Sequence, residues 1–108
     1  MDKKLINDIN YTNFAQFINS GLVLLDFWAP WCTACKTQDK IYKELADMFS
    51  KNLTIGKIDV ADNRFLADKF GVRNIPHIIL LKDGEKLFQM SGIENKEYLI
   101  SQIKKHII

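Results

Sequence analysis

The amino-acid sequence predicts an α/β domain with a mixed β-sheet of about five strands and helices on both faces of the sheet. The near-continuous apolar run Leu22–Trp28 is typical of a strand that is covered on both faces, and Leu53–Val60 is predicted as a second buried strand. The segment between them, 33–49, lacks Pro and Gly and carries apolar residues at helical spacing. Two later apolar runs flank Asp83-Gly84, a dipeptide that strongly favours a hairpin of antiparallel strands.

The chain begins with a predicted short strand and a predicted short helix. Residues 4–9, KLINDI, are interpreted as an edge strand. Asn10 or Thr12 can cap the helix that follows, and Gly21 is expected to end it. The apolar face of this helix comprises Phe14, Phe17 and Ile18.

The strand Leu22–Trp28 is expected to lie in the centre of the sheet and to end before Pro30, which cannot donate a ladder hydrogen bond. A helix of about four turns is predicted after it, over residues 33–49. The side chains of this helix expected to face the core are Ile41, Leu45, Met48 and Phe49.

The second predicted crossover follows the strand Leu53–Val60. Asp62 can cap a helix there, and Gly71 is expected to close it. The apolar residues of this helix are Phe65, Leu66 and Phe70. Because such crossovers are right-handed, functional loops are expected at the carboxyl ends of the parallel strands.

The last third of the chain predicts the hairpin and a final helix. The hairpin strands are residues 77–81 and 86–90. Asn95 is expected to cap the final helix. The apolar stripe of that helix comprises Leu99, Ile103 and Ile107.

The composition predicts one compact domain over residues 1–108. Hydrophobic residues make up 47% of the chain and charged residues 26%, an ordinary globular composition. The net charge of +2, with both signs interspersed, indicates neither nucleic acid nor an anionic membrane as a partner. No apolar run approaches the roughly 18 residues of a membrane span. We therefore expect a soluble cytoplasmic protein, although a chain released from a leader or a tether would have the same composition.

The two cysteines of the chain, Cys32 and Cys35, are placed where a helix is predicted to begin. Residues at this spacing on a helix have Cα atoms about 5 Å apart, and a disulfide requires about 4.4 to 6.8 Å. A disulfide that closes so small a loop stabilises a protein by only about 2 kcal/mol in the chain-entropy estimate. Reversible redox chemistry therefore explains the pair better than structural cross-linking does.

The position of each cysteine predicts its role. Cys32 precedes the helix, where free backbone N–H groups, those of Ala34 and Cys35, can point at its sulfur and favour the thiolate. Cys32 is thus the predicted nucleophile. Cys35, further into the helix, is expected to be more buried and to resolve the mixed disulfide. A zinc site and an inert pair of core cysteines remain as alternatives, but the chain offers no further cysteine as a zinc ligand.

The segments DFWAPWCTACK, KIDV, GVRNIP and KDGEKL resemble the thioredoxin family at nearly the same positions and separations. The similarity extends from about Leu22 to Ile107. It implies the thioredoxin fold and a protein disulfide reductase that uses no cofactor beyond its own Cys32–Cys35 disulfide. It also implies disulfide-containing protein substrates, a thioredoxin reductase-type electron donor and a monomeric state.

The resemblance also assigns roles to residues near the cysteines. Pro76 is similar to the family's cis-proline, and Ile75 before it would offer its backbone to an extended substrate segment. A proline that only interrupts the chain before a strand is the alternative. Asp26, inside an apolar strand, should have a raised pKa and is a candidate proton acceptor for Cys35, with Lys57 as its partner. A buried ion pair without a catalytic role is the alternative.

Three further residues match positions around the family's active site. Trp28 is expected to support the active-site loop by packing, whereas Trp31 should lie on the exposed recognition surface. Gly92 corresponds to a glycine beside the substrate groove, where a partner backbone can approach closely. The alternative is that Gly92 only marks the end of a strand.

The sequence departs from the family pattern at three places. Thr33-Ala34 replaces Gly-Pro between the cysteines, which should alter the reduction potential and the contacts to substrate. Lys40 replaces a proline that kinks the helix, so a straighter helix is predicted. His77 follows the proline, and its ring could tune the thiolate if it faces Cys32.

These observations leave alternatives to a reductase. The altered dipeptide is compatible with a disulfide oxidant or isomerase. The same fold could serve as a redox-inactive binding module that holds a partner strand at Ile75-Pro76. A dimer bridged by a metal ion or an iron–sulfur cluster through the cysteines of two chains is a further alternative.

Overall fold

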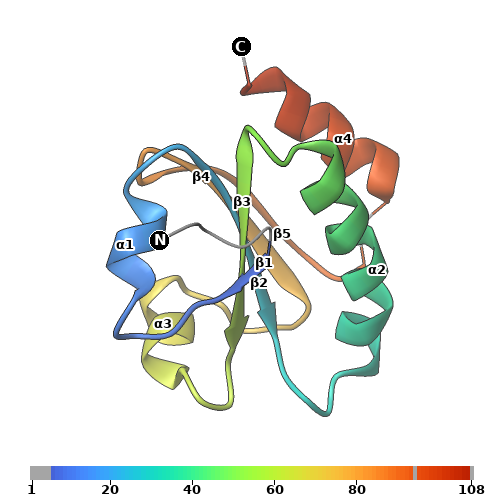
Figure 1. Ribbon diagram of the computed structural model, residues 1–108. Helices are drawn as coiled ribbons and strands as arrows, with labels where there is room; N and C mark the ends of the chain where they lie inside the picture. The colour runs from blue at the N-terminus through green and yellow to red at the C-terminus, as the bar shows by residue number, and fades with distance from the viewer. Residues whose placement is uncertain (1–5, 94, 108) are drawn as a thin grey trace.

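The computed structural model describes residues 6–93 and 95–107, and its ribbon is shown in Figure 1. Helices and strands alternate through most of the chain, as the sequence predicts. In order, the elements are β1 (Ile6–Asp8), α1 (Phe14–Ile18), β2 (Leu22–Trp28), α2 (Thr33–Met48), β3 (Leu53–Asp59), α3 (Arg64–Lys69), β4 (His77–Lys82), β5 (Glu85–Ser91) and α4 (Lys96–Lys105). The predicted first strand is confirmed over Ile6–Asp8, whereas Ile9 follows the strand; Lys4 and Leu5 lie outside the described residues.

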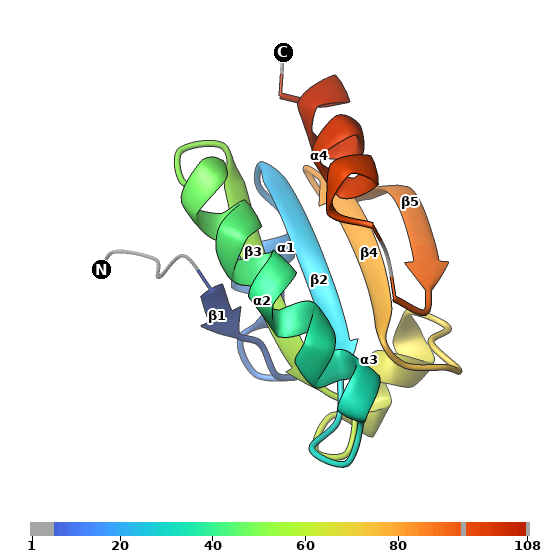
Figure 2. The same ribbon diagram turned by 90° about the vertical axis from the view of Figure 1, so that its right-hand side faces the viewer.

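The strands form one five-stranded sheet in the order β1-β3-β2-β4-β5. β3 pairs in parallel with both β1 and β2, whereas β4 runs antiparallel to β2 and to β5. The predicted mixed sheet is thereby confirmed. Because β2 and β3 are parallel neighbours, their carboxyl ends meet at one edge of the sheet, and the chain enters α2 at that edge (Figures 1 and 2).

Helices cover both faces of the sheet, with α1 and α3 on one side and α2 and α4 on the other (Figures 1 and 2). Alternation along β2 divides its apolar side chains between two core clusters. Leu22 and Leu24 pack with residues of α2 and α4. Val23, Leu25 and Phe27 pack on the opposite face, towards α1 and α3.

The predicted hairpin is confirmed. Asp83 and Gly84 both have positive φ, 50° and 85°, as the tight turn that suits twisted antiparallel strands requires. Asn95 caps α4 as predicted, because its Oδ1 accepts a hydrogen bond from the Tyr98 N–H at 3.2 Å.

The predicted caps of the two short helices are wrong. α1 begins after Asn13, not after Asn10 or Thr12, and Asn10 Oδ1 instead accepts hydrogen bonds from the backbone N–H groups of Thr12 and Asn13. α3 begins after Asn63, not after Asp62. Several residues with similar capping ability stand next to one another at both places, so composition alone does not select one of them.

One predicted core position is wrong, because Met48 is 51% exposed at the end of α2. Phe65, one of the apolar residues of α3, is 64% exposed. The buried apolar faces of these helices instead include Leu45 of α2 and Leu66 of α3, which are both fully buried. Among the described residues, none of the helices has the length and apolar character needed to cross a membrane.

Candidate active site

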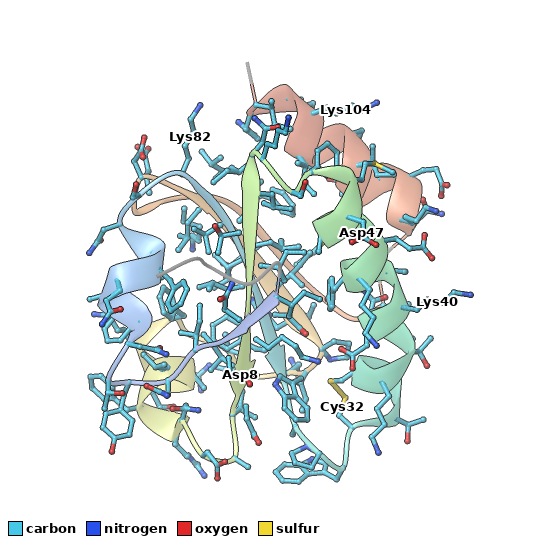
Figure 3. The ribbon with its side chains drawn as sticks, viewed as in Figure 1. Asp8, Cys32, Lys40, Asp47, Lys82 and Lys104 are labelled. Carbon is cyan, nitrogen blue, oxygen red and sulfur yellow. A yellow bond between two sulfur atoms is a disulfide. The ribbon has the colours of Figure 1, made fainter. Side chains whose placement is uncertain are left out.

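The cysteine pair lies at the first turn of α2, beside the carboxyl ends of β2 and β3 (Figure 3). β2 ends at Trp28, and a tight turn follows in which the Cys32 N–H donates to the Ala29 carbonyl at 3.0 Å. Cys32 is the N-cap of α2 and has an extended backbone. Cys35 is one helical turn further on, with its Cα atom 5.3 Å from that of Cys32, and the two side chains form a disulfide.

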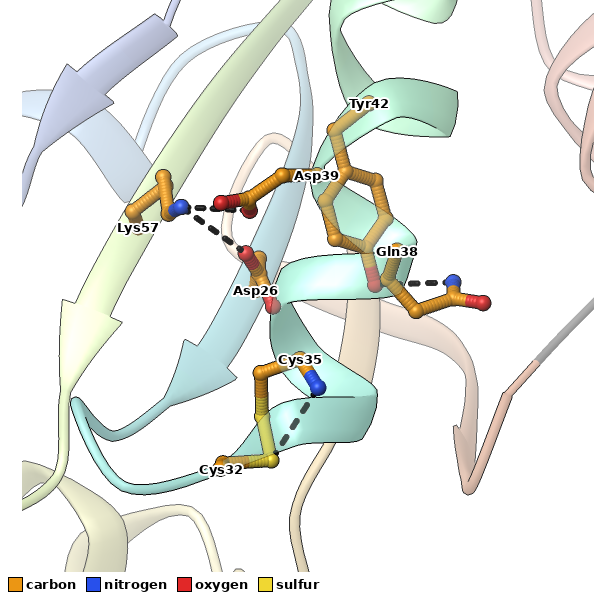
Figure 4. A network of polar contacts seen from close by, with 7 residues as sticks. All are labelled: Asp26, Cys32, Cys35, Gln38, Asp39, Tyr42 and Lys57. Atoms are coloured by element: carbon orange, nitrogen blue, oxygen red, sulfur yellow. Dashed lines mark hydrogen bonds and ion pairs between the residues drawn. A yellow bond between two sulfur atoms is a disulfide. The ribbon is translucent and has the colours of Figure 1, made fainter.

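The helix start directs a backbone donor at the sulfur of Cys32. The Cys35 N–H lies 3.1 Å from Cys32 Sγ and donates to it, as Figure 4 shows. Of the two amides expected to point at this sulfur, those of Ala34 and Cys35, the Cys35 amide is therefore the one that makes the contact. A donor in this position stabilises negative charge on Cys32 when the disulfide is reduced.

The two cysteine residues differ in exposure. Cys35 is 2% exposed and Cys32 is 9% exposed, so Cys32 is the outer residue, as predicted. They form a small cluster with Ala29, against which Trp28, Ala34, Val60 and Ile75 pack. Trp31, in contrast, is 70% exposed.

A cleft of about 600 Å³ is lined by Trp31, by residues of α3, and by Val60 and Ile75, which also pack against the cysteine cluster. The Ile75–Pro76 peptide bond at this place is cis, as predicted. The Gly92 N–H donates to the Pro76 carbonyl at 2.8 Å, which joins the loop before β4 to the end of β5.

Gly92 follows the last residue of β5, so it does mark a strand end. Its φ of +91° is a conformation that residues with a side chain rarely adopt. Apart from its chain neighbours, no atom of the described residues would lie within 4 Å of a Cβ atom at this position, which is compatible with the approach of a partner backbone. Both interpretations of Gly92 are therefore compatible with the structure.

Asp26 is fully buried on β2 and lies opposite Lys57 in the register of β2 and β3; Figure 4 draws it between Lys57 and Cys35. Burial raises the pKa of Asp26 to about 7, against the opposing effect of Lys57 and with a smaller contribution from Asp39 in the same direction as burial. Lys57 Nζ is 3.9 Å from Asp26 Oδ2. Neither carboxyl oxygen of Asp26 receives a hydrogen bond from any residue that the structure describes.

Comparison with known proteins identifies the family of this chain. The sequence model of the family "Thioredoxin" matches residues 5–105. The chain belongs to the thioredoxin family. It is 40% identical to the thioredoxin of Chlamydia pneumoniae over 102 residues, which cover 94% of this chain and 99% of that protein. It is also 41% identical to the thioredoxin of Bacillus subtilis over 95 residues, which cover 88% of this chain and 91% of that protein.

A solved thioredoxin structure has the same fold. A single-residue mutant of the thioredoxin from Halobacterium salinarum NRC-1 matches with a TM-score of 0.86 and 27% identity, over 95% of this chain and 91% of that one. The predicted thioredoxin fold is thereby confirmed. This member of the family is a thiol–disulfide oxidoreductase, a protein disulfide reductase of the thioredoxin type with Cys32 and Cys35 as its disulfide.

The structure also shows what the family pattern in the sequence did not reveal. Lys57 Nζ lies 2.5 Å from Asp39 Oδ1 and 4.8 Å from the centroid of the Trp28 ring, nearer to Asp39 than to Asp26. Asp39 was not among the predicted site residues. Its position four residues after Cys35 was a usable signal, because residues at that spacing lie on the same face of a helix.

His77 lies on β4 directly opposite Phe27 of β2 and makes an edge-on ring contact with it. Its Nε2 is 3.2 Å from Gln89 Oε1, and burial lowers the pKa of the imidazole. Phe27 belongs to the cluster on the α1 and α3 face. None of the described contacts of His77 involves Cys32, so the predicted tuning role lacks the contact on which it depended.

The residues that replace Gly-Pro lie in the first turn of α2. Thr33 is exposed at the first helical position, and Ala34 packs beside the cysteines. α2 is continuous through Lys40. The straighter course expected for this helix stays a prediction.

Proposed function

We propose that this chain reduces disulfides in other proteins by a two-step exchange in which Cys32 attacks and Cys35 resolves. The main support is the first turn of α2, where Cys32 is the outer sulfur and the Cys35 N–H donates to it at 3.1 Å. An anion at this place gains both a hydrogen bond and the favourable end of the helix dipole. Cys35 is almost fully buried and would be reached only by the adjacent sulfur.

The exchange balances in atoms and electrons. The Cys32 thiolate attacks one sulfur of the substrate disulfide and forms a mixed disulfide, and the other substrate sulfur leaves as a thiolate that takes a proton from solvent. The Cys35 thiol then loses its proton and attacks Cys32 Sγ. This forms the Cys32–Cys35 disulfide, releases the second substrate thiolate, and transfers two electrons to the substrate in total.

Asp26 is the proposed proton acceptor for Cys35. A carboxylate with a pKa of about 7 is a much stronger base than an exposed aspartate, and at neutral pH a large share of it is ionised. Lys57 is its proposed charged partner on β3. Figure 4 draws Asp26 between Lys57 and Cys35.

The cleft beside Trp31 and Ile75 is the proposed substrate site. An extended segment of the substrate would pair with the backbone of Ile75, next to the cis Pro76, and pass close to Gly92. Thr33 and Ala34, at the start of α2, would contact the same segment near its disulfide. The proposed partners are disulfide-containing proteins and a thioredoxin reductase-type electron donor, and the proposed state is a cytoplasmic monomer.

Trapping the mixed disulfide tests the two cysteine roles. With Cys35→Ser, Cys32 should attack insulin and remain joined to it, because no resolving thiol is present; insulin reduction with dithiothreitol should fall to the uncatalysed rate. With Cys32→Ser, no adduct should accumulate, since Cys35 is buried. Mass spectrometry of the products separates the two variants. Equal adduct formation by both variants would contradict the assignment.

The Thr33-Ala34 dipeptide bears on whether this reductase also acts as an oxidant or isomerase, because residues between the cysteines influence the reduction potential. The redox equilibrium of the pure protein with glutathione decides between the reducing and the oxidising direction. A potential in the reducing range of thioredoxins supports the reductase, and a far more oxidising one supports the alternative. A redox-inactive binding module would keep its biological effect when both cysteines are replaced by serine.

A further inference from the structure

Two carboxylates compete for one ammonium group behind the active site. Lys57 Nζ is 2.5 Å from Asp39 Oδ1 but 3.9 Å from Asp26 Oδ2 (Figure 4). The contact with Asp39 is a charge-assisted hydrogen bond, and the distance to Asp26 lies beyond hydrogen-bond range. Lys57 therefore pairs with Asp39 and leaves Asp26 with a Coulombic contact only.

Asp39 and Asp26 differ in their surroundings. The side chain of Asp39 is 36% exposed on α2, whereas that of Asp26 is 1% exposed on β2. The ring of Trp28 also contacts the ammonium, 4.8 Å from its centroid. Lys57 is thus held by two groups other than Asp26, and the buried carboxyl receives no hydrogen bond from the described residues.

Few other titratable groups face Asp26. From β3 the group is Lys57, and from β4 the paired residue is the apolar Ile78. The titratable groups on the sheet-facing side of α2 are Cys35, Asp39 and Tyr42, of which Tyr42 accepts a hydrogen bond from Gln38 (Figure 4). Lys57 and Asp39 are therefore the charged groups available to adjust Asp26.

We propose that Asp39 is a positioning residue for proton transfer: it holds the Lys57 ammonium beyond hydrogen-bond distance of Asp26 and thereby keeps Asp26 basic enough to accept the Cys35 proton. This inference rests on the proposed role of Asp26. Without Asp39, the ammonium could close the remaining gap to Asp26 Oδ2 and stabilise its ionised form. The charges agree with this inference, since burial and Asp39 both raise the pKa of Asp26, whereas Lys57 lowers it.

Asp39→Asn tests the inference with little change in size. A neutral amide holds an ammonium less firmly than a carboxylate does. The pKa of Asp26 in the oxidised protein should therefore fall by about one pH unit, as expected when an opposite charge comes close. Carboxyl carbon NMR measures this pKa directly, without any substrate. The rate at which Cys35 attacks a mixed disulfide should rise with pH as Asp26 ionises. In the variant this rise should occur at a lower pH, by a similar amount.

Asp47→Asn is the matched control. Asp47 is exposed on the same helix, two turns beyond Asp39, and its replacement by asparagine removes the same charge as Asp39→Asn does. Figure 3 labels it on the part of α2 away from Cys32. The pKa of Asp26 should stay within a few tenths of a pH unit of the parent value in this variant. An equal shift in both variants would show a general charge effect and overturn the inference.

The double variant separates positioning from direct repulsion between the two carboxylates. In a Lys57→Met background no ammonium can move, so Asp39→Asn should shift the pKa of Asp26 much less than it does in the parent protein. An undiminished shift in that background overturns the positioning role, as does no shift in the parent. Asp26→Asn tests the proposed function separately: if the rate of Cys35 attack keeps its size and pH profile, Asp26 is not the acceptor, whatever the NMR titrations show.

Discussion

Asp26 shows at the residue scale how a single position on a strand acquires its chemistry. Alternation along β2 turns it to the same face as Leu22 and Leu24, where α2 and α4 exclude water. The apolar pattern of the strand predicted this burial and the raised pKa, and both are confirmed. The pairing of Lys57 with Asp39 could not be predicted, because it depends on how α2 is seated on the sheet and on the conformation of a long lysine side chain.

Asp26→Asn should stabilise the oxidised protein at alkaline pH. The pKa of about 7 in the folded chain exceeds the ordinary 3.8, so between these values the unfolded chain has released a proton that the folded chain retains. The free energy of unfolding therefore falls as pH rises through this window. This loss of stability is complete above the pKa that Asp26 has in the folded chain. At about pH 8 the variant should gain about 2 to 4 kcal/mol.

Guanidinium unfolding of parent and variant at two pH values checks this prediction. The gain should shrink towards zero at about pH 4, where Asp26 is protonated in the folded protein and the cost has disappeared. A variant that is no more stable at alkaline pH, or that gains equally at both pH values, shows that burial does not penalise the Asp26 charge.

At the scale of elements, hydrophobic periodicity located the helices and strands more accurately than capping residues located the starts of helices. The apolar runs located β2, α2 and the hairpin within a residue or two, because burial against the sheet fixes which face each element presents. The caps of α1 and α3 were wrong, since neighbouring Asn, Asp and Thr residues offer alternative starts of similar energy. Asn95 had no such competitor, and its cap is confirmed.

Asn95→Ala should lower the free energy of unfolding by about 1 kcal/mol, the usual cost of removing an N-cap side chain. The reason is the loss of the hydrogen bond from the Tyr98 N–H, which leaves a donor at the start of α4 without its partner. Asn95→Ser is the control, because serine can accept the same bond and should retain most of the stability. Denaturant unfolding measures both; equal losses with alanine and serine would exclude a capping role.

At the scale of the whole molecule, the topology assembles the candidate site from distant parts of the chain. The parallel pair β2 and β3 ends beside the start of α2, and the loop with cis Pro76 comes to the same edge through β4. The motifs predicted that these segments share one site. The role of His77 could not be predicted in this way. Its residue type allowed a tuning role, but strand alternation places its ring beside Phe27, on the face of the sheet that α1 and α3 cover.

The most direct test of the mechanism is the alkylation of the two thiols of the reduced protein as a function of pH, followed at each residue by mass spectrometry. The start of α2 and the exposure of the two sulfurs predict that Cys32 reacts first, and at a pH where a free thiol, with a pKa of about 8.5, is still mostly protonated. Cys35 should react only slowly over that range. Alkylation of Cys32 only at the pH of an ordinary thiol, or alkylation of Cys35 first, would contradict the proposed roles.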